Sequence, residues 1–215
     1  MAQPNLQPGT YTYEHMPALQ TMTRVFQANN IAFAIMGGFA LKLRGSTRDT
    51  RDVDIALGCT MQRLIEVLSA QPRIRRPAGP TSGVMRVFVK VGGQLTPGIP
   101  ELWVMVDLIL RGSLGAPDNP QTASETVSVT TSVGPKQYLV LDILNTMISK
   151  LGAFFARGAI NDYNDLVFLI LRYAEQIYAI RAQLNQAHRQ HFVTTYARTN
   201  QENRVRRVKH TLGVA

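Results

Sequence analysis

The chain has 215 residues, 45% of them hydrophobic; this suits one globular domain, or a core with a small helical appendage, and excludes a disordered chain. A single cysteine, Cys59, excludes an intrachain disulfide and a cysteine zinc cluster. The formal net charge of +9 favours a polyanionic partner such as RNA or a nucleoside triphosphate, and a basic but ordinary enzyme surface explains it equally well.

The beginning of the chain predicts neither a membrane span nor an export signal. No apolar run reaches the roughly 18 residues that a transmembrane helix needs, so no membrane partner is expected. Residues 1–17 contain no apolar signal-peptide region, which predicts an intracellular, cytoplasmic protein. Residues 1–13 are rich in Pro and Gln and are expected to form a loose arm before a helix over residues 15–29.

A short strand, a glycine pair and a brief helix are predicted next. Residues 32–36 are apolar, as in a buried strand, and Gly37 and Gly38 end it before a helix over residues 39–43. Glycines at such a position can bring backbone N–H groups against a phosphate, or they can simply make a tight turn.

The strand predicted over residues 52–57 carries two carboxylates on one face. Asp52 and Asp54 alternate with apolar residues, so both acids point away from the apolar side. Neighbouring carboxylates repel each other, but their oxygens are the ligands that usually hold Mg²⁺. A solvated edge strand would also explain Asp-x-Asp alone; the upstream glycine pair, with Arg48 and Thr50 just before the acids, favours a metal site.

After a helix predicted over residues 61–68, the loop at residues 71–83 contains Arg73, Arg75 and Arg76. This loop can be a mobile basic lip for a polyanion or a solvated connection between two elements.

Three further strands are predicted over residues 84–91, 101–110 and 126–133. The second is a nearly continuous apolar run, as expected for a central strand buried on both faces. Its one carboxylate in the apolar stretch, Asp107, is costly to bury unless it is paired or binds a cation. The residues alone leave a structural carboxylate and a metal ligand equally open.

The C-terminal part is predicted to be helical, with Asp142 as the N-cap of a long helix. Lys150 and Arg157 on this helix are two turns apart and share a face. Lys150 can approach triphosphate oxygens, and Arg157 can grip phosphate or pair with Asp162 on the next helix. The alternative is a solvated helix face whose cations pair with acids of the following helix. Near the C-terminus, a basic segment covers residues 203–210.

Two segments resemble a known family. The run GGFAL at residues 37–41, followed by RDTRDVDI at residues 48–55, resembles the signature of the polymerase-beta-like nucleotidyltransferase superfamily. The resemblance is strongest to its minimal branch of AbiEii-type toxins and aminoglycoside/lincosamide nucleotidyltransferase-like proteins. The run KLGAFFARGAINDYNDL at residues 150–166 resembles the second conserved block of the AbiEii-type proteins.

The resemblance implies an α/β (α+β) fold with a mixed sheet and flanking helices. It implies a nucleotidyltransferase core over residues 14–135 and a helical region over residues 136–215. The implied cofactors are two Mg²⁺ ions, and the implied substrate is an NTP. The catalytic and metal-binding carboxylates would be Asp52, Asp54 and Asp107. The nucleotide-binding residues would be Gly37, Gly38, Arg48, Thr50 and Lys150.

The sequence leaves the acceptor of the nucleotidyl group open. An RNA acceptor such as a tRNA end is favoured by the net charge of +9 and by two basic stretches, residues 73–76 and 204–209. A small molecule or a protein side chain is the alternative. A non-catalytic nucleotide-binding relative is less favoured, because all three carboxylates are present. Neither an antitoxin partner nor an oligomeric state is indicated.

Overall fold

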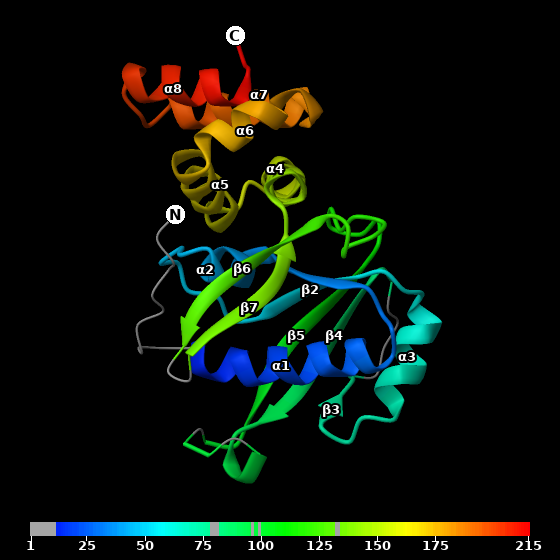
Figure 1. Cartoon of the computed structure of the whole chain (residues 1–215). Helices are drawn as coiled ribbons and strands as arrows, with labels where there is room; N and C mark the ends of the chain where they lie inside the picture. The colour runs from blue at the N-terminus through cyan, green and yellow to red at the C-terminus, as the bar shows by residue number, and fades with distance from the viewer. Residues whose placement is uncertain (1–11, 78–81, 96, 99, 132–133) are drawn as a thin grey trace. The chain divides into compact units, whose positions relative to one another are not determined.

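The computed structural model of the chain describes residues 12–77, 82–95, 97–98, 100–131 and 134–215 (Figure 1). The loose arm expected over residues 1–13 lies outside the described residues, except for residues 12 and 13, which begin the first helix. The chain divides into two compact units, residues 1–141 and residues 142–215.

Seven described strands of the first unit form one mixed sheet in the order β3-β4-β5-β2-β1-β7-β6. The strands are β1 (Phe33–Met36), β2 (Val53–Leu57), β3 (Ile74–Arg75), β4 (Val84–Val91), β5 (Leu102–Leu110), β6 (Ser124–Thr131) and β7 (Gly134–Leu141). The β2–β5 and β1–β7 pairs are parallel, and the remaining neighbours are antiparallel. This arrangement confirms the predicted mixed sheet.

Three helices accompany this sheet in the described part of the first unit: α1 (Thr12–Ala28), α2 (Gly37–Leu43) and α3 (Met61–Ser69). The helix α3 begins where the sequence predicts, because the Thr60 hydroxyl accepts a hydrogen bond from the Arg63 N–H at 3.2 Å. A short 3₁₀ turn, η1, covers Gly93–Leu95.

The two faces of the sheet differ in what they bury. On one face, apolar residues of α1 such as Leu19 and Met22 pack with Ile35, Val53 and Ile55 in the main core. Side chains alternate along a strand, so the neighbours of these residues lie on the opposite face. That face holds a smaller apolar cluster made of Ala34, Met36, Ala56, Ile109, Ala116 and Leu141. It is also the face on which Asp54 and Asp107 lie, since Asp54 is directly opposite Met36 and beside Asp107.

Two details of the first unit differ from the sequence expectation. The strand expected over residues 126–133 is β6, which pairs with β7 in a hairpin; its last two expected residues lie outside the described ones. The loop expected over residues 71–83 contains the short strand β3. β7 lies within the first unit, which extends to residue 141.

The second unit is helical, as predicted. Its helices are α4 (Ile143–Arg157), α5 (Ile160–Arg172), α6 (Ala174–Ile180), α7 (Gln186–Ala197) and α8 (Glu202–Leu212), with a 3₁₀ turn η2 (Arg181–Gln183). The Asp142 carboxylate caps α4 by accepting the Asn145 N–H at 2.8 Å, which confirms the predicted N-cap. The basic segment at residues 203–210 belongs to α8, whose Val205, Val208 and Leu212 are buried.

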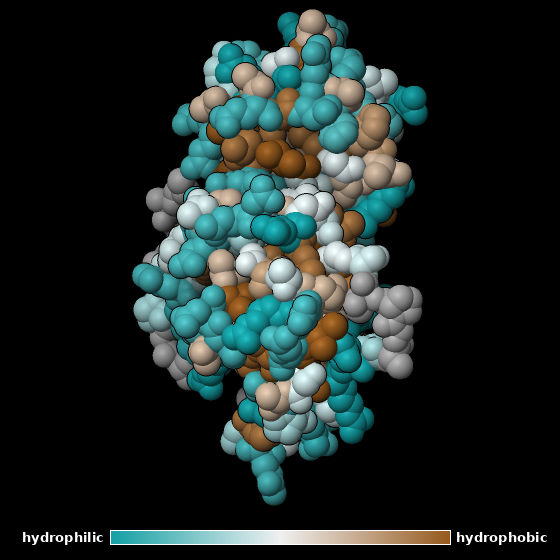
Figure 2. All heavy atoms as spheres, turned by 90° about the vertical axis from the view of Figure 1, so that its right-hand side faces the viewer, coloured by the Kyte–Doolittle hydropathy of each residue, from teal (hydrophilic) through white to brown (hydrophobic). Residues whose placement is uncertain are grey.

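The surface carries both hydrophilic and apolar residues (Figure 2), as expected for a chain in which 45% of the residues are hydrophobic. Hydrophilic residues cover most of the face drawn in Figure 2, and apolar residues show between them. Throughout the described residues, every helix is too short or too polar to cross a bilayer.

Candidate metal and nucleotide site

The three acids singled out in the sequence come together in the first unit. The parallel pairing of β2 with β5 places Asp54 directly beside Asp107, and Asp52 stands one residue before β2 begins. One oxygen from each of the three carboxylates lies within 4.8 Å of the others. Asp107 is 9% exposed, and Asp52 and Asp54 are half-buried. Like charges at such distances repel each other, so the cluster requires compensating positive charge.

The glycine turn packs directly on the carboxylates. Gly37 has a φ of +67°, and a Cβ at this position would lie 1.8 Å from an Asp54 carboxylate oxygen. A Cβ on Gly38 would lie 2.5 Å from the Arg48 guanidinium and 3.0 Å from the Thr50 hydroxyl. The absence of side chains at both glycines therefore allows β2 and the preceding loop to approach the turn.

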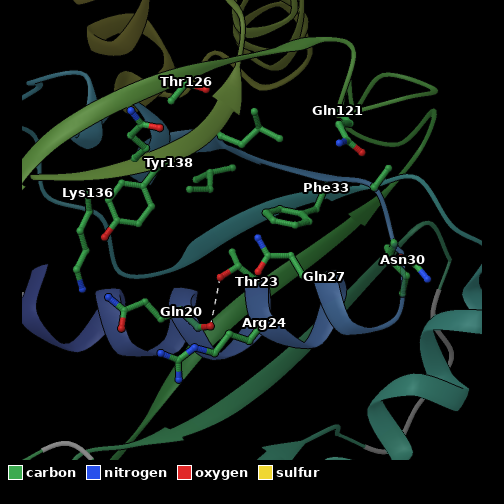
Figure 3. A pocket seen from close by; sticks show the side chains of 15 residues that line it. Gln20, Thr23, Arg24, Gln27, Asn30, Phe33, Gln121, Thr126, Lys136 and Tyr138 are labelled. Atoms are coloured by element: carbon green, nitrogen blue, oxygen red, sulfur yellow. Dashed lines mark hydrogen bonds between the residues drawn. The ribbon is translucent and has the colours of Figure 1, made fainter.

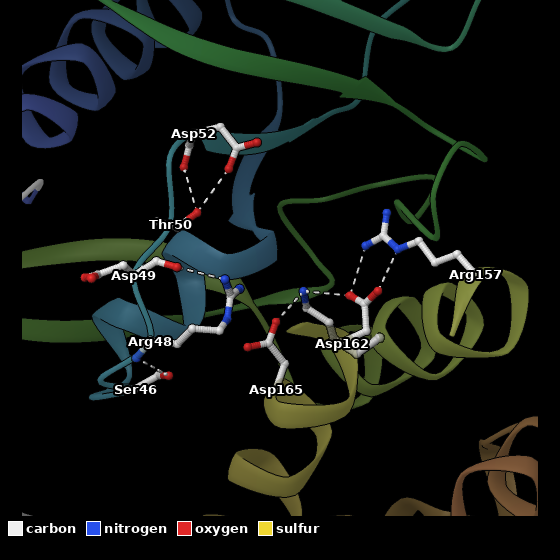
Figure 4. Close-up of polar contacts among 9 residues, drawn as sticks. Ser46, Arg48, Asp49, Thr50, Asp52, Arg157, Asp162 and Asp165 are labelled. Carbon is white, nitrogen blue, oxygen red and sulfur yellow. Dashed lines mark hydrogen bonds and ion pairs between the residues drawn. The ribbon is translucent and has the colours of Figure 1, made fainter. Parts of the chain in front are cut away.

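Thr50 fixes the first of the acids. Its hydroxyl lies 3.0 Å from an Asp52 carboxylate oxygen and 3.3 Å from the Asp52 carbonyl oxygen (Figure 4). Thr50 is 6% exposed, so its hydroxyl is held in place as a donor to Asp52. Arg48 donates to the Asp49 carbonyl oxygen at 2.8 Å, on the same loop (Figure 4). The glycines, Arg48, Thr50 and the acids are thus a single group of neighbours.

A residue to which the sequence assigned no role, Arg86, binds Asp107. Arg86 on β4 stands directly across from Asp107 on β5. Its Nε and Nη2 atoms donate to the two Asp107 oxygens at 2.8 and 2.7 Å. Hydrogen bonding and charge from Asp107 raise the pKa of Arg86, and the charges of Asp52 and Asp54 add to this shift. Only the register of β4 with β5 identifies Asp107 as the partner of Arg86.

The donor set suits a hard divalent cation. Three convergent carboxylates supply only oxygen ligands, as Mg²⁺ and Mn²⁺ prefer. The half-buried positions of Asp52 and Asp54 also leave oxygens accessible from solvent. The residues present therefore fit the metal site that the family resemblance implies.

Lys150 occupies a different setting from the one that the sequence suggested. It is 7% exposed, and its ammonium lies 2.8 Å from Asp165 and 3.5 Å from Asp162, two acids of α5 (Figure 4). The alternative prediction, that this cation pairs with acids of the following helix, is confirmed, but the helix face is buried at Lys150 rather than solvated. The spacing that puts Lys150 and Arg157 on one face of α4 does not reveal that α5 covers this face. Its binding of phosphate stays a prediction.

The expected pairing of Arg157 with Asp162 is confirmed within the second unit. The guanidinium donates to both Asp162 oxygens, at 2.6 and 3.0 Å (Figure 4). Burial raises the pKa of Asp162, but the Arg157 hydrogen bonds and the Lys150 charge outweigh it and hold the pKa below its usual range. The carboxylate stays ionised at neutral pH and binds both cations.

Replacing Lys150 by methionine is expected to destabilise the second unit by about 3 kcal/mol, because two buried carboxylates would lose a counter-ion. Urea unfolding measures the change. Arg172→Met serves as the control, since Arg172 is an exposed cation on α5, and such a surface change costs about 0.5 kcal/mol or less. Equal stability of the two variants would show that the Lys150 ion pairs contribute nothing.

A cavity of about 800 Å³ lies between α1 and the β6–β7 hairpin (Figure 3). Arg24, Lys136 and Tyr138 are among its lining residues, and none of the lining residues that the structure describes is acidic. Phe33 and Ile35 also line it, and these β1 side chains point to the α1 face of the sheet. The cavity is therefore separate from the carboxylates, which lie on the other face.

The chain resembles solved structures at low sequence identity. JHP933 from Helicobacter pylori matches with a TM-score of 0.51 and 16% identity, over 94% of this chain and 90% of that one. The antibiotic-resistance factor ANT(2'')-Ia matches with a TM-score of 0.45 and 11% identity, over 84% and 94% of the two chains. The lincosamide antibiotic adenylyltransferase LnuA matches with a TM-score of 0.41 and 12% identity, over 70% and 93%.

No protein-family model and no curated protein sequence matches the chain. At identities this low, the structural likeness concerns the fold alone. The chain therefore shares its fold with the JHP933 structure, over almost all of both chains.

Proposed function

We propose that this chain is a metal-dependent nucleotidyltransferase that moves a nucleoside monophosphate from an NTP to an acceptor. The observation that carries the proposal is the convergence of Asp52, Asp54 and Asp107 beside the glycine turn. An acceptor oxygen forms a bond to the α-phosphorus of the NTP, the bond from that phosphorus to the bridging oxygen breaks, and pyrophosphate leaves.

Asp52, Asp54 and Asp107 would hold two divalent cations, which would stabilise the charge on the attacking and leaving oxygens. Asp52 and Asp54 would help to hold the ions, and the Thr50 hydroxyl keeps Asp52 oriented. Asp107 acts on the acceptor, because it takes the proton from the attacking hydroxyl. Most of the rate enhancement then comes from positioning and from charge neutralisation.

The triphosphate is proposed to bind at the glycine turn. A side chain at Gly37 would collide with Asp54, and a side chain at Gly38 would collide with Arg48 and Thr50, so the backbone of the turn carries no Cβ at either position. Arg48 supplies positive charge at the same place. Lys150, in the second unit, stays a phosphate ligand predicted from the sequence, and this role requires its ammonium to exchange Asp165 for a phosphate oxygen.

Among acceptors, the proposal favours RNA. Arg204, Arg206 and Arg207 are all exposed on α8, on a helix that is anchored by its buried apolar residues. Arg75 and Arg76 are exposed at and just after β3. Exposed arginines on defined elements can contact phosphates and release counter-ions, whereas a small acceptor gains nothing from them.

Changing the three α8 arginines together to glutamine is expected to reduce the salt dependence of RNA binding. Each lost phosphate contact lowers the magnitude of the log–log slope by about 0.7 for single strands. The measurement is fluorescence anisotropy with a single-stranded RNA over a range of salt concentrations. Because α8 is packed in the second unit, glutamine substitution is preferable to truncation. An unchanged slope would exclude these arginines as RNA contacts.

The proposed reaction is tested with each of the four NTPs labelled at the α-phosphate, in the presence of Mg²⁺ and total RNA. We expect label from one or more NTPs to enter RNA, and EDTA to prevent it. Label in a protein or a small molecule instead would identify the alternative acceptor class. Absence of label in RNA, protein and small molecules would contradict nucleotidyl transfer.

A further inference from the structure

We propose that Arg86 is a built-in counter-ion that competes with divalent cations for Asp107. The inference rests on the metal site of the proposed function and adds to it a residue that sets metal affinity. Its basis is geometric: one guanidinium occupies both oxygens of the carboxylate that the site needs as its third ligand.

The pairing of Arg86 with Asp107 is fixed by the sheet. The two residues are direct partners in the antiparallel β4–β5 register, so their side chains emerge together on one face. The Nε and Nη2 atoms meet Oδ1 and Oδ2 at 2.8 and 2.7 Å, which is the two-point geometry of an arginine–carboxylate pair. Neither Asp107 oxygen is therefore available to a cation without competition from the guanidinium.

The charge balance explains why such a counter-ion is needed. The oxygens of Asp52, Asp54 and Asp107 lie within 4.8 Å of one another. Without a cation, three negative charges would repel at short range. One Arg86 charge lowers that repulsion, and a divalent ion would neutralise the cluster more completely. Arg86 and a divalent ion thus perform the same electrostatic task and exclude each other in part.

The Arg86 side chain can also move away from Asp107. Its side chain is 53% exposed, whereas that of Asp107 is 13% exposed. A guanidinium on the solvent side can rotate away without emptying space in the core. Asp107 stays where the β2–β5 pairing places it. Divalent binding is then expected to displace the arginine and leave the carboxylates in place.

The test is the affinity for Mn²⁺ alone, measured by electron paramagnetic resonance of the free ion, without nucleotide or acceptor. Arg86→Met keeps the side-chain length and removes the charge. We expect its Mn²⁺ dissociation constant to be about tenfold lower than that of the wild type, since hydrogen bonds to charged groups are worth this much. Arg86→Lys, which keeps the charge but loses the two-point geometry, is expected to fall between them.

Lys90→Met is the matched control. Lys90 lies on the same face of β4 and pairs at 2.8 Å with Glu101, the residue just before β5. The variant therefore removes an equal charge and an ion pair away from the three acids. Its Mn²⁺ affinity is expected to stay within about twofold of the wild type. If Arg86→Met binds Mn²⁺ less than about threefold more tightly than Lys90→Met, or more weakly, the competition is overturned.

A second measurement covers the metal-free protein. Arg86→Met is expected to lower the melting temperature in EDTA, and saturating Mn²⁺ is expected to remove most of the difference from the wild type. A difference of equal size with and without Mn²⁺ would mean that Arg86 has only a structural role and would overturn the proposal.

These outcomes separate the inference from the proposed reaction. If the wild type binds Mn²⁺ and transfers nucleotide but Arg86→Met gains no affinity, the competition alone is wrong. If the affinities follow the expectation but no NTP is turned over, the reaction alone is wrong.

Discussion

Replacing Asp54 by asparagine is expected to lower nucleotidyl transfer by at least about 10³-fold while leaving the fold intact. Asp54 lies at the centre of the site, beside Asp107 in the sheet and against Gly37 in the turn. An asparagine has nearly the same shape, so the β-sheet pairing and the packing against the turn are kept. The neutral amide is, however, a much weaker ligand for a divalent cation than a carboxylate.

The same variant should be more stable than the wild type when metal is removed. Asp54 is one of three carboxylates within 4.8 Å, and neutralising it reduces their mutual repulsion. Pyrophosphate release and thermal unfolding in EDTA measure the two effects. Asp118→Asn makes the same chemical change at an exposed position and should alter neither. Retention of a tenth or more of the activity in Asp54→Asn would contradict the role of Asp54.

Replacing Gly37 by alanine is expected to cost about 2–3 kcal/mol of stability and to abolish transfer. Two causes add. The φ of +67° disfavours any residue with a Cβ, and that Cβ would lie 1.8 Å from an Asp54 oxygen. Since Asp54 is held in β2, either the turn or the carboxylate must shift, and the alignment of the three acids is lost.

Gly112→Ala separates the two causes. Gly112 has a φ of +77° in the same unit, but a Cβ there would meet nothing within 4 Å. The Gly112→Ala variant should therefore lose only the stability that the unfavourable φ costs, about 1 kcal/mol, and should keep full activity. Urea unfolding and pyrophosphate release of both variants test this. Equal losses for Gly37→Ala and Gly112→Ala would show that the close approach to Asp54 has no consequence.

The local parts of the site could be predicted because they depend on alternation and spacing. The period of two along residues 52–57 puts Asp52 and Asp54 on one face, and the glycine pair ends the preceding strand. The convergence of Asp107 could not be obtained in this way. It depends on the parallel pairing of β2 with β5, which are separated along the chain by α3, β3 and β4, and only the family resemblance suggested it.

The features that were missed all depend on long-range packing. Arg86 needed the β4–β5 register to be linked to Asp107. The strand β7 begins with Gly, Pro, Lys and Gln, which do not show an apolar alternation, and it is a strand because it pairs with β6 and β1. The burial of Lys150 could not be predicted either, because helical spacing identifies a face of α4 but does not show that α5 covers it.

The most direct test of the metal-site proposal is a crystal structure with Mn²⁺ and a non-hydrolysable NTP analogue, analysed by the anomalous scattering of Mn. The proposal predicts anomalous peaks bridged by Asp52, Asp54 and Asp107, with the triphosphate against the turn at Gly37 and Gly38. Peaks should be lost in Asp54→Asn crystals grown in the same way. Bound nucleotide without an Mn²⁺ ion at these carboxylates, or with its triphosphate away from the turn, would contradict the proposed site.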